Sequence, residues 1–450
     1  MGFARLRAAL FAAPCLALAL ALAPNSAHAD QWWGGFGPAG PGIPGGLNGP
    51  VYALLEHQDL LYVGGDFTQA GEVACSNIAI WDGSMWTPLG AGVNGTVRTL
   101  AAYGTSVMVG GDFTEAGGEP RGRIARWDDG WIPAPPPLDG SVQTLYVDGT
   151  TLYAGGDFLN SGATPLNRTG IWNGADWSPI GAGVNARVSC FAPFGGDLIV
   201  GGWFNLAGGT AVNRIASFDG ADYSGLGLGL NGPAWAARPF EGEIAVGGFF
   251  EFAGTELTFG VARWDGIAWQ PYGAGLGGNV VAFTEWQGDL VAGGWYEISN
   301  GIETNRIARW DGTSWLGFDD GVDNRVHAVA TFRGALYVGG EFLNASNVPS
   351  LRIARWDAGS SSVGVALSSG LPRLLLSPNP ARSLVAYSLE GLQSLTHLRI
   401  LTPDGREVAR KSGPLGTSGR LDLSSLAPGV YLVEGASGGR PLRARLVRSR

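Results

Sequence analysis

The stretch Leu61-Tyr-Val-Gly-Gly-Asp-Phe67 decides the fold, because close copies of it return along the chain at a nearly constant interval. Each copy follows the one before by 45 or 46 residues. The second glycines of the copies are Gly65, Gly111, Gly156, Gly202, Gly248, Gly294 and Gly340. An aromatic series keeps the same intervals and consists of Trp81, Trp127, Trp172, Phe218, Trp264, Trp310 and Trp356. Two independent markers therefore indicate seven repeated units.

Each unit has room for four short strands. Residues 96–133 contain TVRTLAAY and TSVMVGGDF, then a polar stretch, then RIARWDD and WIP. The third and fourth segments are joined by WDGSMW and its counterparts, in which a central Gly-X pair favours a two-residue type II′ turn. This turn predicts cross-strand aromatic pairs. The predicted pairs are Trp81 with Trp86, Trp264 with Trp269 and Trp310 with Trp315.

A four-stranded sheet with aromatic residues on its faces cannot bury those faces alone, so successive sheets must pack on one another. A ring of such sheets covers every face and leaves only short edges. We therefore predict an all-β protein in which residues 30–360 form a seven-bladed β-propeller. The last unit has Ser361 where a fourth-strand Trp is expected, whereas the QWWGGF segment at residues 31–36 has no partner in its own unit. We predict that this segment closes the last blade.

The glycine pair at Gly64 and Gly65 is predicted to be structural. A side chain there would collide with the adjacent blade, which is a common reason for glycine in a strand. A phosphate-binding loop would need a helix beginning just after the glycines, and the sequence contains no such start.

These units resemble kelch repeats. The resemblance rests on a glycine pair that ends the second strand, an aromatic residue on the third strand and Trp on the fourth, as in Gly64-Gly65, Trp81 and Trp86. It covers residues 31–357 and implies a kelch-like β-propeller. The spacing between the last two aromatics is shorter than in typical kelch units, so the repeats are a variety of that family.

The start of the chain is typical of a secretory signal peptide. Arg5 and Arg7 precede an apolar run, and a small-residue pattern predicts cleavage near Ala29, so residues 1–29 are expected to be removed. Later apolar runs are interrupted within a few residues by glycine or charge, and we expect no integral membrane span.

The end of the chain breaks the repeat. Residues 361–372 are predicted to be a flexible linker, and residues 373–450 a small β-sandwich. This tail resembles the C-terminal sorting domains of the type IX secretion system, which are related to flagellar hook-cap immunoglobulin-like domains. The matching residues are Ser377-Pro378-Asn379-Pro380, Asp404-Gly405-Arg406, and Leu426 with Gly429-Val430-Tyr431. The resemblance implies contact with the secretion machinery and a location outside the cell or on the outer-membrane surface.

Charge separates the two parts of the chain. Residues 30–360 contain 15 Arg against 33 Asp and Glu, whereas residues 361–450 contain twelve Lys and Arg against five Asp and Glu. The acidic body argues against nucleic acid as a partner. The mature chain has only His57, His327 and His397, which do not form a zinc or copper constellation.

One column of the repeat varies while its neighbours stay uniform. The column lies on the first strand and consists of Tyr52, Arg98, Gln143, Ser189, Trp235, Val281 and His327. A position that varies between otherwise uniform repeats is not constrained by packing within the blade. We therefore predict that the polar and aromatic members of this column bind a ligand at one mouth of the central channel. Adaptable packing between blades is the alternative. Aromatic and hydrogen-bonding side chains together suit a sugar ring.

A second column stands three residues before the first strand of each unit. It consists of Asn48, Asn94, Asp139, Asn185, Asn231 and Asp323, with Gly277 as the seventh member. Asn and Asp are ordinary turn residues before a strand. The alternative is a ring of oxygen ligands for a hard cation such as Ca²⁺. Apart from this calcium alternative, we expect no cofactor.

The sequence thus predicts an exported propeller that binds a carbohydrate or an extracellular protein and is not an enzyme. One alternative is a carbohydrate-active lyase or hydrolase that uses Tyr52, Arg98 and His327 in the channel. Another alternative is a protein that is displayed at the cell surface and has a purely structural role.

Overall fold

Every regular element of the computed structural model is a β-strand in the residues that the structure describes. These are residues 31–36, 46–299, 302–357, 373–377, 384–390, 395–402, 406–427, 429–437 and 440–448. The chain divides into two compact units, Met1–Ser360 and Ser361–Arg450. The predicted signal peptide and linker lie outside the described residues, as do Pro378-Asn379-Pro380 and Asp404-Gly405 of the tail motifs.

The first unit contains seven four-stranded antiparallel sheets in its described part. The first strands are β2 (Val51–His57), β8 (Val97–Tyr103), β14 (Val142–Asp148), β20 (Val188–Phe194), β26 (Ala234–Phe240), β32 (Asn279–Trp286) and β38 (Val326–Phe332). The second strands are β3 (Leu60–Gly65), β9 (Ser106–Gly111), β15 (Thr151–Gly156), β21 (Asp197–Gly202), β27 (Glu243–Gly248), β33 (Asp289–Trp295) and β39 (Ala335–Gly340).

The outer half of each sheet is shorter. The third strands are β6 (Ile78–Trp81), β12 (Ile124–Trp127), β18 (Thr169–Trp172), β24 (Ile215–Phe218), β30 (Val261–Trp264), β36 (Ile307–Trp310) and β42 (Ile353–Asp357). The fourth strands are β7 (Trp86–Pro88), β13 (Trp131–Ile132), β19 (Trp177–Pro179), β25 (Tyr223–Gly225), β31 (Trp269–Pro271), β37 (Trp315–Gly317) and, in the last sheet, β1 (Gln31–Trp33).

A two-residue-strand hairpin stands between the second and third strands of every sheet. These hairpins are β4 (Gln69–Ala70) with β5 (Val73–Ala74), β10 (Glu115–Ala116) with β11 (Glu119–Pro120), β16 (Asn160–Ser161) with β17 (Thr164–Pro165), β22 (Leu206–Ala207) with β23 (Thr210–Ala211), β28 (Phe252–Ala253) with β29 (Glu256–Leu257), β34 (Ile298–Ser299) with β35 (Ile302–Glu303), and β40 (Asn344–Ala345) with β41 (Val348–Pro349).

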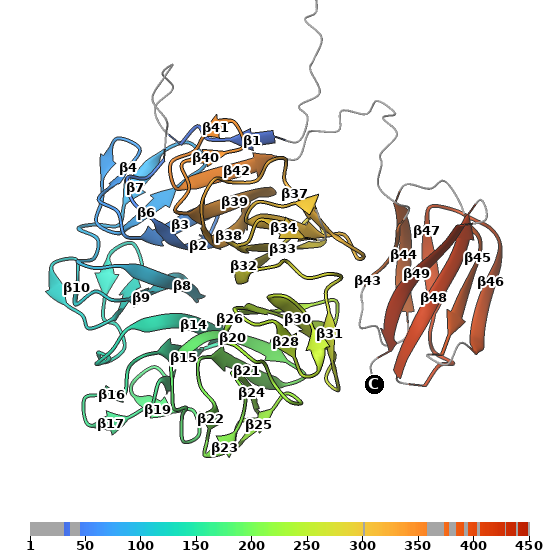
Figure 1. The fold of residues 1–450 in the computed structure, drawn as a ribbon, viewed down its shortest axis with the longest axis horizontal. Coiled ribbons are helices and arrows are strands. Elements are labelled where there is room, and N and C mark those ends of the chain that lie inside the picture. The colour runs from blue at the N-terminus through green and yellow to red at the C-terminus, as the bar shows by residue number, and fades with distance from the viewer. Residues whose placement is uncertain are drawn as a thin grey trace, which may run out of the picture. The chain divides into compact units, whose positions relative to one another are not determined.

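The sheets are arranged as a closed ring, with the first strands innermost (Figure 1). Each first strand contacts the first strand of the next sheet, and β38 of the last sheet contacts β2 of the first. The last and first sheets approach each other as closely as the other neighbouring sheets do, since a Cβ on Gly339 would lie 2.5 Å from Val51 Cγ1. The predicted all-β propeller architecture is confirmed.

The first glycine of each pair makes room for the neighbouring sheet. A Cβ on Gly64 would lie 2.4 Å from Cγ1 of Val97, which is the first residue of β8. Equivalent clashes occur at Gly110, Gly155, Gly201, Gly247, Gly293 and Gly339. Sheets can therefore pack closely at the ring centre only where this side chain is missing, as the sequence predicts.

This contact gives a testable prediction. Gly64→Ala is expected to lower the free energy of unfolding by about 1–3 kcal/mol, because the added methyl group overpacks the junction. Val97→Ala in the same chain should recover part of that loss, since the two residues touch. Tryptophan fluorescence during chemical denaturation reports on this unit alone, because all seventeen Trp lie in residues 32–356.

The control is Gly130→Ala, because nothing lies within 4 Å of a Cβ there. We expect this variant to stay within about 0.5 kcal/mol of the unmodified protein. Equal losses for Gly64→Ala and Gly130→Ala, or strict additivity of Gly64→Ala and Val97→Ala, would contradict the steric explanation.

The outer hairpins confirm the predicted turn and register. Trp81 lies opposite Trp86, with ring centroids 5.0 Å apart. Gly83 takes a φ of +97°, as the first central residue of a type II′ turn requires. The Asp82 carboxylate accepts hydrogen bonds from the backbone N–H groups of Ser84 and Met85, both at 2.7 Å. The aspartate in these stretches therefore holds its own turn.

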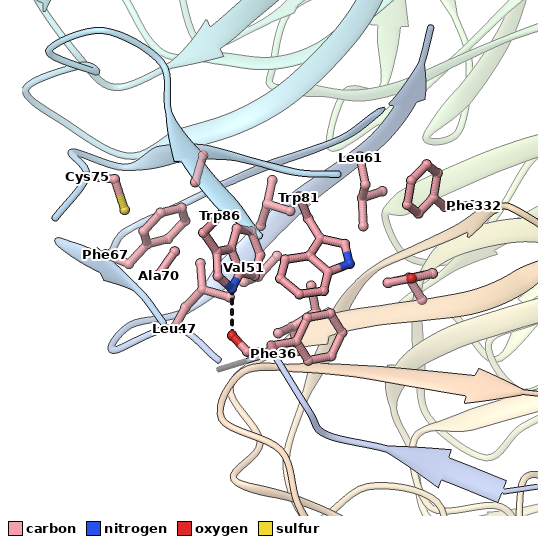
Figure 2. Close-up of a cluster of buried hydrophobic side chains, with 14 of the residues drawn as sticks. Phe36, Leu47, Val51, Leu61, Phe67, Ala70, Cys75, Trp81, Trp86 and Phe332 are labelled. Atoms are coloured by element: carbon pink, nitrogen blue, oxygen red, sulfur yellow. Dashed lines mark hydrogen bonds between the residues drawn. The ribbon is translucent and has the colours of Figure 1, made fainter. Parts of the chain in front are cut away.

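The N-terminal segment closes the last sheet, as predicted. Strand β1 pairs with β42, so the fourth strand of the last sheet comes from the opposite end of the unit. Phe36 then reaches the first sheet, where it is fully buried and its carbonyl accepts a hydrogen bond of 2.8 Å from Trp86 Nε1. Figure 2 shows Phe36 among the buried side chains that include Trp81 and Phe332. The segment thus joins the two ends of the ring.

The second unit has its own core. Its strands form one sheet of β43 (Arg373–Ser377), β44 (Leu384–Glu390) and β47 (Ser418–Asp422), and another of β46 (Glu407–Leu415), β45 (Leu395–Leu401), β48 (Gly429–Ser437) and β49 (Arg440–Arg448). Its buried hydrophobic cluster includes Val385, Tyr387, Ile400 and Val433, and every member belongs to this unit.

Candidate functional site

Each residue of the variable column is the extra residue of a β-bulge. In the first sheet, Val51 pairs with Gly65 and Ala53 pairs with Gly64, which leaves Tyr52 between them without a partner. The same shift places Arg98, Gln143, Ser189, Trp235, Val281 and His327 in bulges. A bulge turns a side chain away from the regular alternation of a strand. This explains why the column varies while the flanking residues do not.

The second glycine of each pair permits the bulge. A Cβ on Gly65 would lie 2.0 Å from the carbonyl oxygen of Pro50, the residue just before the inner strand. The corresponding distances at the six other second glycines are 2.0–2.2 Å. The two glycines therefore have separate roles, one toward the next sheet and one toward the bulge of its own sheet.

A further column, which the sequence analysis did not single out, lies beside the bulges. It is the residue directly after each glycine pair and consists of Asp66, Asp112, Asp157, Trp203, Phe249, Trp295 and Glu341. The backbone N–H of Asp112, for example, donates a 2.9 Å hydrogen bond to the carbonyl of Thr96, which precedes the bulged strand. Its signal in the sequence was wide chemical variation immediately after an invariant pair. We call the end of the ring where these two columns meet the entry face.

Four aromatic side chains gather on the entry face and form what we call the aromatic platform: Trp203, Trp235, Phe249 and Trp295. The Trp235 ring lies 6.4 Å from that of Trp203 and 6.4 Å from that of Phe249, with interplanar angles of 33° and 27°. Trp295 lies 5.1 Å from Trp235 on the next sheet. Trp203 is 44% exposed and Phe249 is 62% exposed, so the platform presents ring surface to solvent.

Polar and ionic groups occupy the neighbouring part of the entry face. His327 Nε2 lies 3.0 Å from Glu341 Oε1, and its ring lies 4.9 Å from the ring of Tyr52. Arg98 forms an ion pair with Asp112 at 2.6 Å, and its Cζ lies 5.8 Å from the Tyr52 ring centroid. We call these five residues the polar cluster. Trp295 links the cluster to the aromatic platform, because its ring lies 5.7 Å from that of His327.

The surroundings of the polar cluster set its protonation. Burial lowers the pKa of His327, and the positive charges of Arg325 and Arg98 act in the same direction, whereas the hydrogen bond and charge of Glu341 oppose them. Burial also raises the pKa of Tyr52, with a contribution from the charge of Glu341. These shifts favour the uncharged imidazole of His327 and the protonated phenol of Tyr52.

The other predicted ligand-binding residues lie on the following sheets. Gln143 Nε2 donates a 2.7 Å hydrogen bond to Ser141 Oγ within its own strand region. Ser189 is half-buried in β20. Just before it, Arg187 forms an ion pair of 2.8 Å with Asp157 of the preceding sheet. The structure thus places the Tyr52 ring beside both Arg98 and His327, and Trp235 is linked to His327 through Trp295.

The Asn and Asp column holds the short hairpins. Asn48 Oδ1 accepts hydrogen bonds from the backbone N–H groups of Thr68 and Gln69, at 2.9 and 3.0 Å. Asn94, Asp139, Asn185, Asn231 and Asp323 accept equivalent hydrogen bonds from residues 20 or 21 positions later. The described part of the chain contains no group of three or more His, Cys, Asp or Glu placed to hold a metal ion. The calcium ring stays a prediction.

Comparisons with known proteins agree with this architecture. Residues 41–128 match the family model of the Rax2 C-terminal beta propeller domain, and residues 376–448 match that of a secretion system C-terminal sorting domain. Each match covers less than half of the chain. No curated protein matches it. The chain therefore contains a β-propeller domain and a type IX sorting tail, and this combination indicates an exported surface protein.

Two solved structures are similar over much of the chain. One is a structural genomics protein of unknown function from Bacteroides thetaiotaomicron, with 9% identity, a TM-score of 0.29 and coverage of 69% of this chain and 98% of its own. The other is Bacteroides ovatus xyloglucan PUL GH43B, with 12% identity, a TM-score of 0.26 and coverage of 89% of both chains.

The described residues contain no helix long and apolar enough to cross a membrane.

Proposed function

We propose that the propeller binds a carbohydrate on its entry face after export, and that it acts as a binding module. The observation that carries this proposal is the aromatic platform with the polar cluster beside it. Pyranose rings present apolar C–H faces edged by hydroxyl groups. Exposed indole and phenyl faces can stack on these C–H faces, and Asp, Glu, Gln and Arg side chains can hydrogen-bond to the hydroxyl groups.

The test is a glycan array probed with the full-length exported protein, followed by analysis of products from every glycan that binds. Binding without a chemical change of the glycan is the expected result. Binding of an extracellular protein but of no glycan would contradict the carbohydrate proposal. Absence of any ligand would favour the alternative of structural display.

Trp235 is the central residue of the platform, and its removal gives a direct prediction. Trp235→Ala is expected to weaken binding to an array hit by about 1–3 kcal/mol, the scale of a lost aromatic anchor. The measurement is isothermal titration calorimetry, together with the melting temperature of each variant. Met85→Ala is a suitable control, because Met85 is 66% exposed and lies in an outer hairpin. If Trp235→Ala instead lowers the melting temperature while affinity per folded molecule holds, Trp235 packs the blades and the column is not a site.

A second candidate function is cleavage of a polysaccharide, and the contact between Tyr52 and His327 favours it. An uncharged imidazole can accept a proton and a protonated phenol can donate one, which is an acid–base pair of the kind that a polysaccharide lyase needs. Product analysis separates this candidate from simple binding. Tyr52→Phe should then abolish turnover while leaving affinity largely unchanged.

We also propose that the seven sheets are the blades of one seven-bladed, kelch-like ring over residues 30–360. The tail over residues 373–450 would then be an immunoglobulin-like sandwich joined by a linker at 361–372. Repeat spacing and sheet order support the first proposal, and the two sheets of the tail support the second. Purification and mass determination of the exported protein would locate the cleavage expected near Ala29.

A further inference from the structure

Exposed apolar side chains are concentrated in one sector of the propeller. Of the eleven large hydrophobic side chains that are exposed in the described residues, seven lie between residues 203 and 259. These are Trp203, Leu206, Leu228, Phe249, Phe252, Leu257 and Phe259. Singly scattered exposed hydrophobic residues need no explanation, whereas a group of them on neighbouring blades favours an interaction site in that sector.

This sector continues outward from the aromatic platform. Phe252 begins β28 only three residues after Phe249, and its backbone N–H donates a 3.0 Å hydrogen bond to Asn231 Oδ1 beside the entry face. The same position in the other units holds Gln69, Glu115, Asn160, Leu206, Ile298 and Asn344. The position is thus apolar in three consecutive units and polar in the rest. The repeat frame does not require an apolar residue there, so its presence next to the platform calls for a binding role.

The charges of the entry face indicate what kind of ligand fits. Arg98 is paired with Asp112 at 2.6 Å, and Arg187 with Asp157 at 2.8 Å. Arg325 lies 3.9 Å from Glu341 and also covers the Trp295 ring, with its Cζ 4.6 Å from the centroid. Each of these three cations already has a carboxylate partner. Arg123, Arg214 and Arg352 also reach this face, where they donate hydrogen bonds to the backbone carbonyls of Asp112, Trp203 and Glu341. It is therefore the acidic body of the propeller as a whole, with 15 Arg against 33 Asp and Glu in residues 30–360, that disfavours a ligand carrying carboxylates or sulfates.

We propose that the ligand is an uncharged, extended polysaccharide that is held on the aromatic platform and continues outward over hairpin β28–β29. This inference rests on the proposed carbohydrate-binding function. The ring planes of Trp203 and Phe249 lie within 33° and 27° of the Trp235 plane, whereas Trp295 is inclined to it by 59°. Several aromatic rings side by side suit contact with consecutive sugars of an extended chain. The outer apolar side chains, above all Phe252, then contact sugars beyond the first.

The test uses defined oligosaccharides with the full-length protein. The probes are β-1,4-linked hexasaccharides of glucose, mannose and xylose, the matching disaccharides, and a hexasaccharide of galacturonic acid. We expect one neutral hexasaccharide to bind at least about tenfold more tightly than its disaccharide. Phe252→Gln should remove most of this difference and leave disaccharide affinity unchanged. Gln69→Ala, at the equivalent position of the first unit, is the matched control and should change neither value.

The outcomes separate the two proposals. Equal affinities for hexasaccharide and disaccharide, a preference for the galacturonate, or an unaffected Phe252→Gln variant would overturn the extended, uncharged ligand while the binding function stands. Failure of all probes and of the wider glycan array would overturn both. If Phe252→Gln instead abolishes self-association, measured by analytical ultracentrifugation, the sector is an interface between copies of this chain and the inference is wrong.

Discussion

A chain that lacks Gln31–Phe36 is expected to melt at a markedly lower temperature than the full-length protein. Strand β1 is the fourth strand of the last sheet, and its loss exposes the edge of β42. Trp32 is 5% exposed, and its Nε1 donates a 3.1 Å hydrogen bond to the carbonyl of Phe318. Phe36 packs in the first sheet and is fully buried (Figure 2). The deletion therefore opens the ring at the one place where it is joined by distant parts of the chain.

Single substitutions give the expected size of the effect. Phe36→Ala should lower the free energy of unfolding by about 3–5 kcal/mol, as for other fully buried aromatic residues. Phe249→Ala makes the same chemical change at a side chain that is 62% exposed, and it should cost less than about 0.5 kcal/mol. Tryptophan fluorescence during denaturation measures both. Unchanged stability of the deletion or of Phe36→Ala would mean that the ring does not depend on this closure.

A chain that ends at Gly370 is expected to lose export completely while its propeller folds and binds as before. The buried cluster of the second unit contains only residues of that unit, among them Tyr387, Leu398 and Leu421. Its removal therefore takes no side chain from the clusters between the propeller sheets. The sorting tail, in contrast, is the part of the chain that matches a secretion domain, at residues 376–448. The truncated protein should accumulate in the periplasm.

Immunoblots of periplasmic, surface and culture fractions measure this effect, and the fluorescence melt of the truncated chain shows whether the propeller is intact. The matched control joins residues 371–450 to an unrelated periplasmic protein, which should then be exported. Export of the truncated chain would contradict the role of the tail. A truncated chain that fails to fold would show that the tail belongs to the core of the propeller.

The sequence alone was sufficient to predict the fold, because the same local turn and strand patterns recur in seven repeats. Gly-X between paired aromatics specifies a turn, and the register of Trp81 with Trp86 follows from it. The unmatched QWWGGF segment and the missing fourth-strand Trp together predict the closure by β1. Such features depend on hydrogen bonding and side-chain alternation over a few residues. They can therefore be predicted from the sequence without knowledge of the tertiary packing.

Only the tertiary structure decided how the variable column is presented and what lies beside it. Tyr52 and its equivalents are bulge residues because Gly65 has no side chain to collide with the carbonyl of Pro50. This contact joins two strands, so it cannot be predicted from either strand segment alone. Glu341, directly after its glycine pair, meets His327 within the last sheet, whereas Trp203 meets Trp235 of the next sheet. The pairing of His327 with Tyr52 joins residues 275 positions apart and exists because the last blade packs on the first. Local sequence rules specify the blades, whereas the composition of the candidate site depends on how the blades close around one centre.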